Sequence, residues 1–260
     1  MYKTKTFLVI SIFLLLVISL SSGCGLDKEA EGNALDHISD DTRLLPSPWT
    51  LHGDGYIIIT RSSDSVNLED ADIPANLVDS YENPFNVMMM VDYKDSPAGP
   101  YRELLYIPGT FLFQDGERHA SITKIFVDSR DSLVNGRLNW GIPKEMADFE
   151  ISKNGRTESF TISSQGKTFA NFSMTTLFGP KIPIGTKLVP EGFRTLGQVL
   201  DGTTFIYALA GRGFKQLALF QPEEFDSTVF PDMTARSVIA AVKISDFELV
   251  FPVAEQLAGE

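Results

Sequence analysis

The chain has 260 residues, of which 43% are hydrophobic, and its formal net charge is -12. This apolar content can build a core, which excludes a disordered acidic protein. Nucleic-acid binding is not expected either. A phosphate backbone is held by clustered Lys and Arg, and no such cluster follows the first few positions.

The first residues have the layout of a secretory signal. Lys3 and Lys5 are followed by a mainly apolar run over 7–20, in which Ser11 and Ser19 are the only polar residues, and this run is short for a membrane span of about 20 residues. A Gly-Cys pair then ends at Cys24, the only Cys in the chain, and it resembles a bacterial lipoprotein cleavage site. Residues 1–23 are therefore predicted to be a signal peptide, with Cys24 as the lipid anchor. The alternative is an incidental Cys in an ordinary cleaved signal.

The next segment, 24–45, is predicted to be an acidic tether, because it has few large apolar residues and no hydrophobic period. Residues 46–260 are predicted to form one domain. Together these segments predict an exported protein of the cell envelope that reaches a membrane through its N-terminal lipid.

Short runs of β-branched and aromatic residues dominate the chain from residue 46 onward. The expected strands are 56–60, 85–93, 103–113, 121–128, 157–163, 167–176, 203–210, 214–220 and 237–251. Glycine-containing turns predict two hairpins, one joining 157–163 to 167–176 and one joining 203–210 to 214–220.

Helical signals are few. Segments 67–72 and 74–80 could form short helices, and 131–135 could form a single turn. The pattern predicts an α+β fold that is mainly antiparallel β, closed or nearly closed, with few short helices.

Two motifs suggest a chemistry. Residues 100–103 read Pro-Tyr-Arg-Glu, and 136–144 read Gly-Arg-Leu-Asn-Trp-Gly-Ile-Pro-Lys. These stretches resemble the acetoacetate decarboxylase family, which has a Pro-Tyr-x-Glu segment and a Gly-Arg followed by an aromatic-Gly-x-Pro-Lys segment. The Pro-Trp opening near Trp49 and the stretch 216–252 extend the resemblance over 46–252.

The resemblance implies an acetoacetate decarboxylase-like barrel in which Lys144 forms an imine with a small β-keto acid. The protonated imine withdraws electrons, carbon dioxide leaves, and water then releases the ketone. An attacking amine must be neutral, whereas free lysine has a pKa of about 10.4. The resemblance therefore implies a site that disfavours the ammonium form by desolvation or nearby cations. It implies no cofactor.

The resemblance also assigns Glu103 as the pocket carboxylate that shuttles protons or positions substrate. It places Tyr101, Arg137 and Trp140 as candidate lining residues of the substrate pocket. From the residues alone, Lys144 is better read as a surface lysine that follows a turn-forming proline, and it is the resemblance that reverses this interpretation. Glu103 could be a solvated edge-strand residue or an ion-pair partner of an arginine, and Arg137 is better suited to binding backbone carbonyls than substrate.

Two positions depart from the family pattern. A second lysine usually follows the catalytic one, but here the residue is Glu145. An anion there would favour the ammonium form of lysine unless the extended segment points Glu145 away. The arginine that can meet the substrate carboxylate aligns near Asp54, which would repel a keto acid. On this alignment the substrate need not be acetoacetate.

Other chemistries have little support. The His residues, His37, His52 and His119, lack ligand-like spacing to acids or Cys, so no metal site is predicted. No Gly-x-Ser-x-Gly elbow is present for a serine hydrolase.

Two main interpretations follow, beside a third in which the protein is a structural module whose apolar pocket is only core. The first is a lyase that uses a Schiff-base lysine on a small keto acid or related carbonyl compound. The second is an envelope lipoprotein that keeps the barrel and its pocket and binds a small molecule without chemistry. Assembly into a homo-oligomer is compatible with both.

Overall fold

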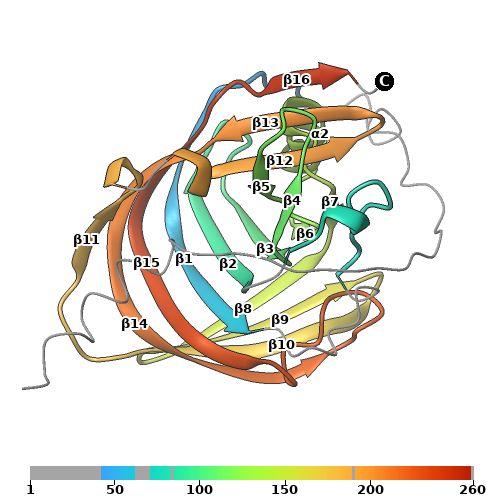
Figure 1. Cartoon of the computed structure of the whole chain (residues 1–260). Coiled ribbons are helices and arrows are strands. Elements are labelled where there is room, and N and C mark those ends of the chain that lie inside the picture. The colour runs from blue at the N-terminus through green and yellow to red at the C-terminus, as the bar shows by residue number, and fades with distance from the viewer. Residues whose placement is uncertain (1–41, 62–70, 83–84, 189–190, 259–260) are drawn as a thin grey trace, which may run out of the picture.

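The computed structural model describes residues 42–61, 71–82, 85–188 and 191–258 (Figure 1). In this part of the chain, strands outnumber helices. The elements are β1 Trp49–Arg61, η2 Val78–Ser80, β2 Asn86–Asp95, β3 Tyr101–Ile107, β4 Thr110–Leu112, β5 Arg118–Ala120, β6 Lys124–Val127, α2 Arg130–Trp140, β7 Lys144–Met146, β8 Asp148–Asn154, β9 Thr157–Ser164, β10 Lys167–Thr176, β11 Ile182–Gly185, η3 Thr186–Leu188, η4 Glu191–Phe193, β12 Thr195–Leu200, β13 Thr203–Ala208, β14 Ala210–Phe225, β15 Ser237–Phe251 and β16 Glu255–Ala258.

The larger sheet has 11 strands in the order β7-β6-β3-β2-β1-β15-β14-β10-β9-β8, with β11 beside β14. It curls into a nearly closed barrel (Figure 1), and its pairings are antiparallel except for the parallel pair β6 and β7. The smaller sheet has 5 strands in the order β16-β13-β12-β5-β4. In Figure 1 it lies at the top of the larger sheet, beside α2. The expected mainly antiparallel, nearly closed fold is confirmed.

Each face of the larger sheet packs against its own hydrophobic core, because side chains alternate along a strand. On β3, Leu104 and Tyr106 belong to a core with the phenylalanines of β9 and β10. Tyr101 and Leu105, which point to the other face of β3, belong to a second core that is shared with α2 and the smaller sheet. The second core surrounds the site described below.

Several predicted elements are confirmed and others are wrong. β9 and β10 form the predicted hairpin, and β15 is the predicted closing strand, paired with both β1 and β14. The second predicted hairpin is wrong, because β13 pairs with β12 in the smaller sheet. The chain changes sheets at Leu209, whose N–H donates to the Arg194 carbonyl at 2.9 Å.

The predicted strand 103–113 is interrupted at Pro108 and Gly109. Proline cannot donate to a ladder, and a β-carbon at Gly109 would lie 2.3 Å from the Glu82 carbonyl oxygen. The predicted short helix at 74–80 is reduced to the 3-10 turn η2. Most of the other predicted short helix, 67–72, lies outside the described residues.

The predicted single turn at 131–135 is the start of an 11-residue helix, α2. The Ser129 side chain caps its first turn by accepting from Ser132 N–H. Gly141 ends it in the left-handed region with φ 64°, as is common after a helix. Asn135 and Gly136 have low helix propensity, but burial of α2 against the second core outweighs that local preference.

The last residues of the predicted tether are bound to α2. Arg43 Nε lies 2.6 Å from Asp131 Oδ2. The Asn135 amide donates to the Arg43 carbonyl at 2.7 Å and accepts from Leu45 N–H at 2.6 Å. Ordered contacts of the domain therefore begin before Pro46.

The predicted signal peptide, the Cys24 anchor and the rest of the tether lie outside the described residues. Within the described ranges, no helix is long and apolar enough to cross a membrane.

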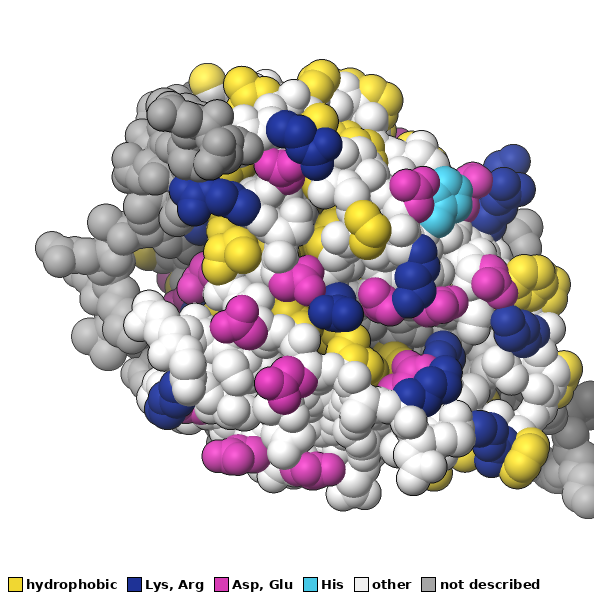
Figure 2. All heavy atoms as spheres, turned by 180° about the vertical axis from the view of Figure 1, so that it is seen from behind, with side chains coloured by type: hydrophobic (Ala, Val, Ile, Leu, Met, Phe, Trp, Pro, Cys, Tyr) yellow, Lys and Arg dark blue, Asp and Glu magenta, His cyan; other side chains and the backbone are white. Residues whose placement is uncertain are grey.

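Figure 2 shows one face of the molecule, on which Lys and Arg side chains are interspersed with Asp and Glu side chains. The overall charge of -12 is thus not gathered into a single-sign surface on this face.

Candidate active site

The two residues expected to carry chemistry form a buried ion pair. Lys144 Nζ lies 2.7 Å from Glu103 Oε2, and the residues are 4% and 3% exposed. Lys144 begins β7 and Glu103 lies in β3, with β6 between them in the sheet. The interpretations of a surface lysine and a solvated edge glutamate are therefore wrong.

The path of the Lys144 side chain is set by α2. A β-carbon at Gly136 would lie 2.7 Å from Lys144 Cδ and 2.8 Å from Cε, so only glycine leaves room for the aliphatic stem. The amine continues toward the start of the helix and donates to Ser132 Oγ at 2.9 Å. Ser132 is fully buried. Sequence reasoning missed Ser132, because nothing in its spacing marks it as a partner of Lys144.

Two tyrosines complete the polar cluster. Tyr93 and Tyr101 are register partners on β2 and β3, and their ring centroids lie 4.6 Å apart. Tyr93 OH donates to Glu103 Oε1 at 3.3 Å, and Lys144 Nζ lies 5.1 Å from the centre of the Tyr101 ring. Burial, followed by the nearby Glu103 carboxylate, raises the pKa of both phenols well above the usual value. Both therefore stay protonated near neutral pH and can act as hydrogen-bond donors.

The smaller sheet supplies a third phenol to this region. Tyr207 on β13 is 3% exposed, and burial raises its pKa, with a further contribution from Glu103. Tyr93 and Tyr207 were both missed from the sequence, since neither belongs to the two recognised motifs.

The two other candidate pocket residues have structural contacts. Arg137 Nε donates to the Lys144 carbonyl at 3.0 Å, so Arg137 holds the backbone of Lys144, as its chemistry suggested. Trp140 Nε1 donates to the Pro252 carbonyl at 2.7 Å, and its ring packs edge-on against Trp49. These contacts fasten the end of α2 to β1 and to the end of β15.

Glu145 does not face the lysine site. It is exposed, whereas Lys144 beside it in β7 is buried. Although Glu145 replaces the second lysine of the family pattern, its carboxylate therefore does not lie against the Lys144 amine.

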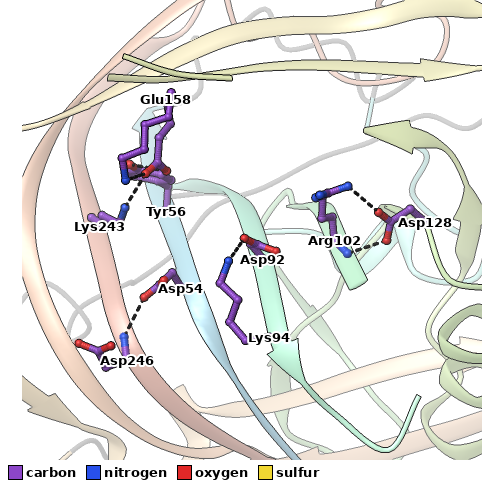
Figure 3. A network of polar contacts seen from close by, with 10 residues as sticks. Asp54, Tyr56, Asp92, Lys94, Arg102, Asp128, Glu158, Lys243 and Asp246 are labelled. Atoms are coloured by element: carbon purple, nitrogen blue, oxygen red, sulfur yellow. Dashed lines mark hydrogen bonds and ion pairs between the residues drawn. The ribbon is translucent and has the colours of Figure 1, made fainter. Parts of the chain in front are cut away.

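Asp54 also lies away from Lys144, which corrects the expectation that it would repel a substrate carboxylate. Asp54, Asp92 and Arg102 are successive register partners on β1, β2 and β3, so their side chains share one face of the sheet. Glu103, the next residue along β3, points to the other face. Figure 3 shows Asp54 beside Asp246, whose N–H donates to Asp54 Oδ1 at 2.9 Å.

The described ranges contain no group of three or more His, Cys, Asp and Glu side chains that could hold a metal ion. The chemical groups that do converge are one amine, one carboxylate and several hydroxyls within an apolar core. This set provides a nucleophile, a proton acceptor beside it and neutral donors.

A family model described as acetoacetate decarboxylase (ADC) matches residues 55–184, which is half of the 260-residue chain and includes both Glu103 and Lys144. The chain belongs to the acetoacetate decarboxylase family. Among curated protein sequences, none matches it.

Solved structures of acetoacetate decarboxylase-like proteins share the fold. The acetoacetate decarboxylase of Legionella pneumophila aligns with a TM-score of 0.58 at 16% identity, covering 90% of this chain and 98% of that one. An acetoacetate decarboxylase-like enzyme from Sphingomonas wittichii RW1 aligns with a TM-score of 0.58 at 12% identity, covering 85% and 95%. The enduracididine biosynthesis enzyme MppR, complexed with pyruvate, aligns with a TM-score of 0.56 at 14% identity, covering 84% and 93%.

Proposed function

We propose that this protein is a Schiff-base enzyme in which Lys144 forms an imine with a small keto acid or related carbonyl compound. The observation that carries the proposal is the buried contact between Lys144 Nζ and Glu103 Oε2 at 2.7 Å. A buried ion pair often adds little stability compared with apolar residues of the same size. Its place in the core is better explained by chemistry than by packing.

The geometry supports a sequence of proton transfers. Glu103 accepts a proton from Lys144 Nζ, and the neutral amine then attacks the carbonyl carbon. The resulting hydroxyl group takes a proton and leaves as water, which gives the protonated imine. Glu103, now protonated, lies beside the reacting nitrogen and can return its proton in this step.

The following step depends on the substrate. In a β-keto acid, the bond to the carboxylate breaks, carbon dioxide leaves, and the electron pair passes to the imine nitrogen to give an enamine. The enamine carbon takes a proton, and water hydrolyses the imine to release the ketone and free Lys144. MppR is described in complex with pyruvate, which supports a small keto acid as the substrate class here.

Borohydride trapping tests the proposal. The protein is incubated with pyruvate or acetoacetate, any imine is reduced with borohydride, and the mass of the peptide containing Lys144 is measured by mass spectrometry. We expect a covalent adduct on Lys144 and none in Lys144→Ala. Lys124→Met is a matched control, because Lys124 is also a poorly exposed lysine in an ion pair, with Asp72. If no carbonyl compound gives an adduct on Lys144 but the compounds still bind saturably, the protein would instead be the non-catalytic binding protein.

We also propose that the domain is held at a membrane through lipid on Cys24. The support is the sequence, in which a basic start, an apolar run and a Gly-Cys pair follow one another. The enzyme would then act in the cell envelope.

A further inference from the structure

A cavity of about 400 Å³ lies away from the Lys144 site and is lined mainly by residues of the larger sheet and its turns. Its lining includes Asp54 on β1 and Lys243 on β15. Asp54 is on the face of the sheet opposite to Glu103, as its register partners show. Lys243 is the register partner of Tyr56, which packs into the core on that same opposite face. The cavity is therefore separate from the site of the proposed reaction.

Within the lining of the cavity, one carboxylate lies between two ammonium groups. Glu158 Oε1 accepts from Lys153 Nζ at 2.8 Å and from Lys243 Nζ at 2.9 Å, and Glu158 Oε2 accepts from Tyr56 OH at 3.0 Å. The side chains of Glu158 and Lys243 are only 16% and 15% exposed. Figure 3 shows Tyr56 and Lys243 meeting at Glu158.

This arrangement leaves an excess of positive charge at the cavity. Burial opposes ionisation of Glu158, but the hydrogen bonds from Lys153 and Lys243 outweigh it and lower the pKa of its carboxyl group. Glu158 is therefore an anion near neutral pH, and one unit of positive charge stays unbalanced among the three groups. Over the whole lining, four Lys and Arg residues face three Asp and Glu residues, within a chain of net charge -12.

The rim of the cavity has an apolar platform. Phe178 is 89% exposed, and the Arg156 guanidinium carbon lies 3.2 Å from the centre of its ring. The Gln216 amide donates to the Gly179 carbonyl at 3.1 Å, which ties this turn to β14. A large aromatic ring held open at a cavity mouth is suited to covering the body of a ligand.

We propose that this cavity binds a small organic carboxylate with a planar or apolar body. The carboxylate group of the ligand would meet Lys153 and Lys243, where positive charge is in excess. Its body would lie against Phe178 at the rim. This site does not depend on imine formation at Lys144.

Calorimetric titration with benzoate, at low ionic strength, tests the proposal. We expect one saturable site in the wild type and in Lys144→Ala, which removes the amine of the other site. Removing one charged hydrogen-bond donor should weaken binding about tenfold or more in Lys243→Met and in Lys153→Met. Lys153 is 61% exposed, so its variant keeps the test valid if Lys243→Met fails to fold.

Phe178→Ala separates the two parts of the proposed site. This substitution should weaken the binding of benzoate and leave the binding of acetate unchanged, because acetate has no ring to cover. Lys167→Met is the control, since Lys167 pairs with Asp226 outside the cavity. The affinity of this variant for benzoate should equal that of the wild type. The proposal is overturned if no saturable binding occurs up to about 10 mM, if both lysine variants bind as the wild type does, or if Lys144→Ala abolishes binding.

Discussion

Gly136 and Lys144 occupy adjoining space, so that a β-carbon at position 136 would lie 2.7 Å from Lys144 Cδ. The lysine stem follows the helix surface at this point, and the amine reaches Ser132 and Glu103 beyond it. The position of the Lys144 amine thus depends on the absence of a side chain at residue 136.

We expect Gly136→Ala to displace the Lys144 amine. The added methyl group should lower the free energy of unfolding by about 1–3 kcal/mol, as overpacking typically does, and should reduce the trapped adduct on Lys144. Thermal unfolding and mass spectrometry measure the two effects. Gly192→Ala is the matched control, because a β-carbon there meets no atom within 4 Å. Equal adduct yields in both variants would show that Gly136 does not position the lysine.

Glu145→Gln should leave the rate of imine formation and its pH dependence unchanged. Glu145 is exposed and its neighbour Lys144 is buried, so its charge is screened by water from the amine. Trapping yields measured across a pH series check this expectation. A clear rise in adduct at neutral pH would mean that Glu145 does act on Lys144.

The segment before Pro46 should contribute to stability through α2. Asn135 is 2% exposed, and its amide bonds both Arg43 and Leu45. Asn135→Ala leaves backbone groups of this segment unpaired, which should cost about 1–3 kcal/mol in the free energy of unfolding. Limited proteolysis of the wild type should stall before Arg43, whereas the variant should be trimmed further. Identical cleavage of both would contradict this role.

Cys24→Ala should release the protein from membranes or block its processing. Lipid on the new N-terminus is the proposed attachment, and Cys24 is the only Cys in the sequence. Membrane fractionation and the intact mass of the native N-terminus measure the outcome. Unchanged membrane partition without a lipid mass would contradict the anchor.

Much of the fold could be predicted because alternation and turn residues act locally. The hairpin of β9 and β10 was predicted since its strands alternate and a glycine turn joins them. The pairing of β13 with β12 could not be predicted, because it is set by a change of sheet at Leu209 rather than by neighbouring residues.

In the candidate site, too, local motifs could be recognised from the sequence and tertiary contacts could not. Lys144 and Glu103 were identified by two motifs, although their contact joins strands that are not neighbours. Ser132 and Tyr207 were missed because their roles arise from tertiary packing of α2 and the smaller sheet. Asp54 was placed wrongly because linear alignment does not specify the face of a strand, which reverses with each residue.

Oxygen exchange tests the proposed imine most directly, because forming and hydrolysing an imine replaces a ketone oxygen with oxygen from water. A small ketone or keto acid is incubated with the protein in ¹⁸O-labelled water, and label in the carbonyl group is followed by mass spectrometry. We predict faster exchange with the wild type than without protein, and no acceleration by Lys144→Ala or Lys144→Arg, since a guanidinium stays charged. Exchange by the wild type at the protein-free rate with every carbonyl compound would contradict a Schiff-base enzyme.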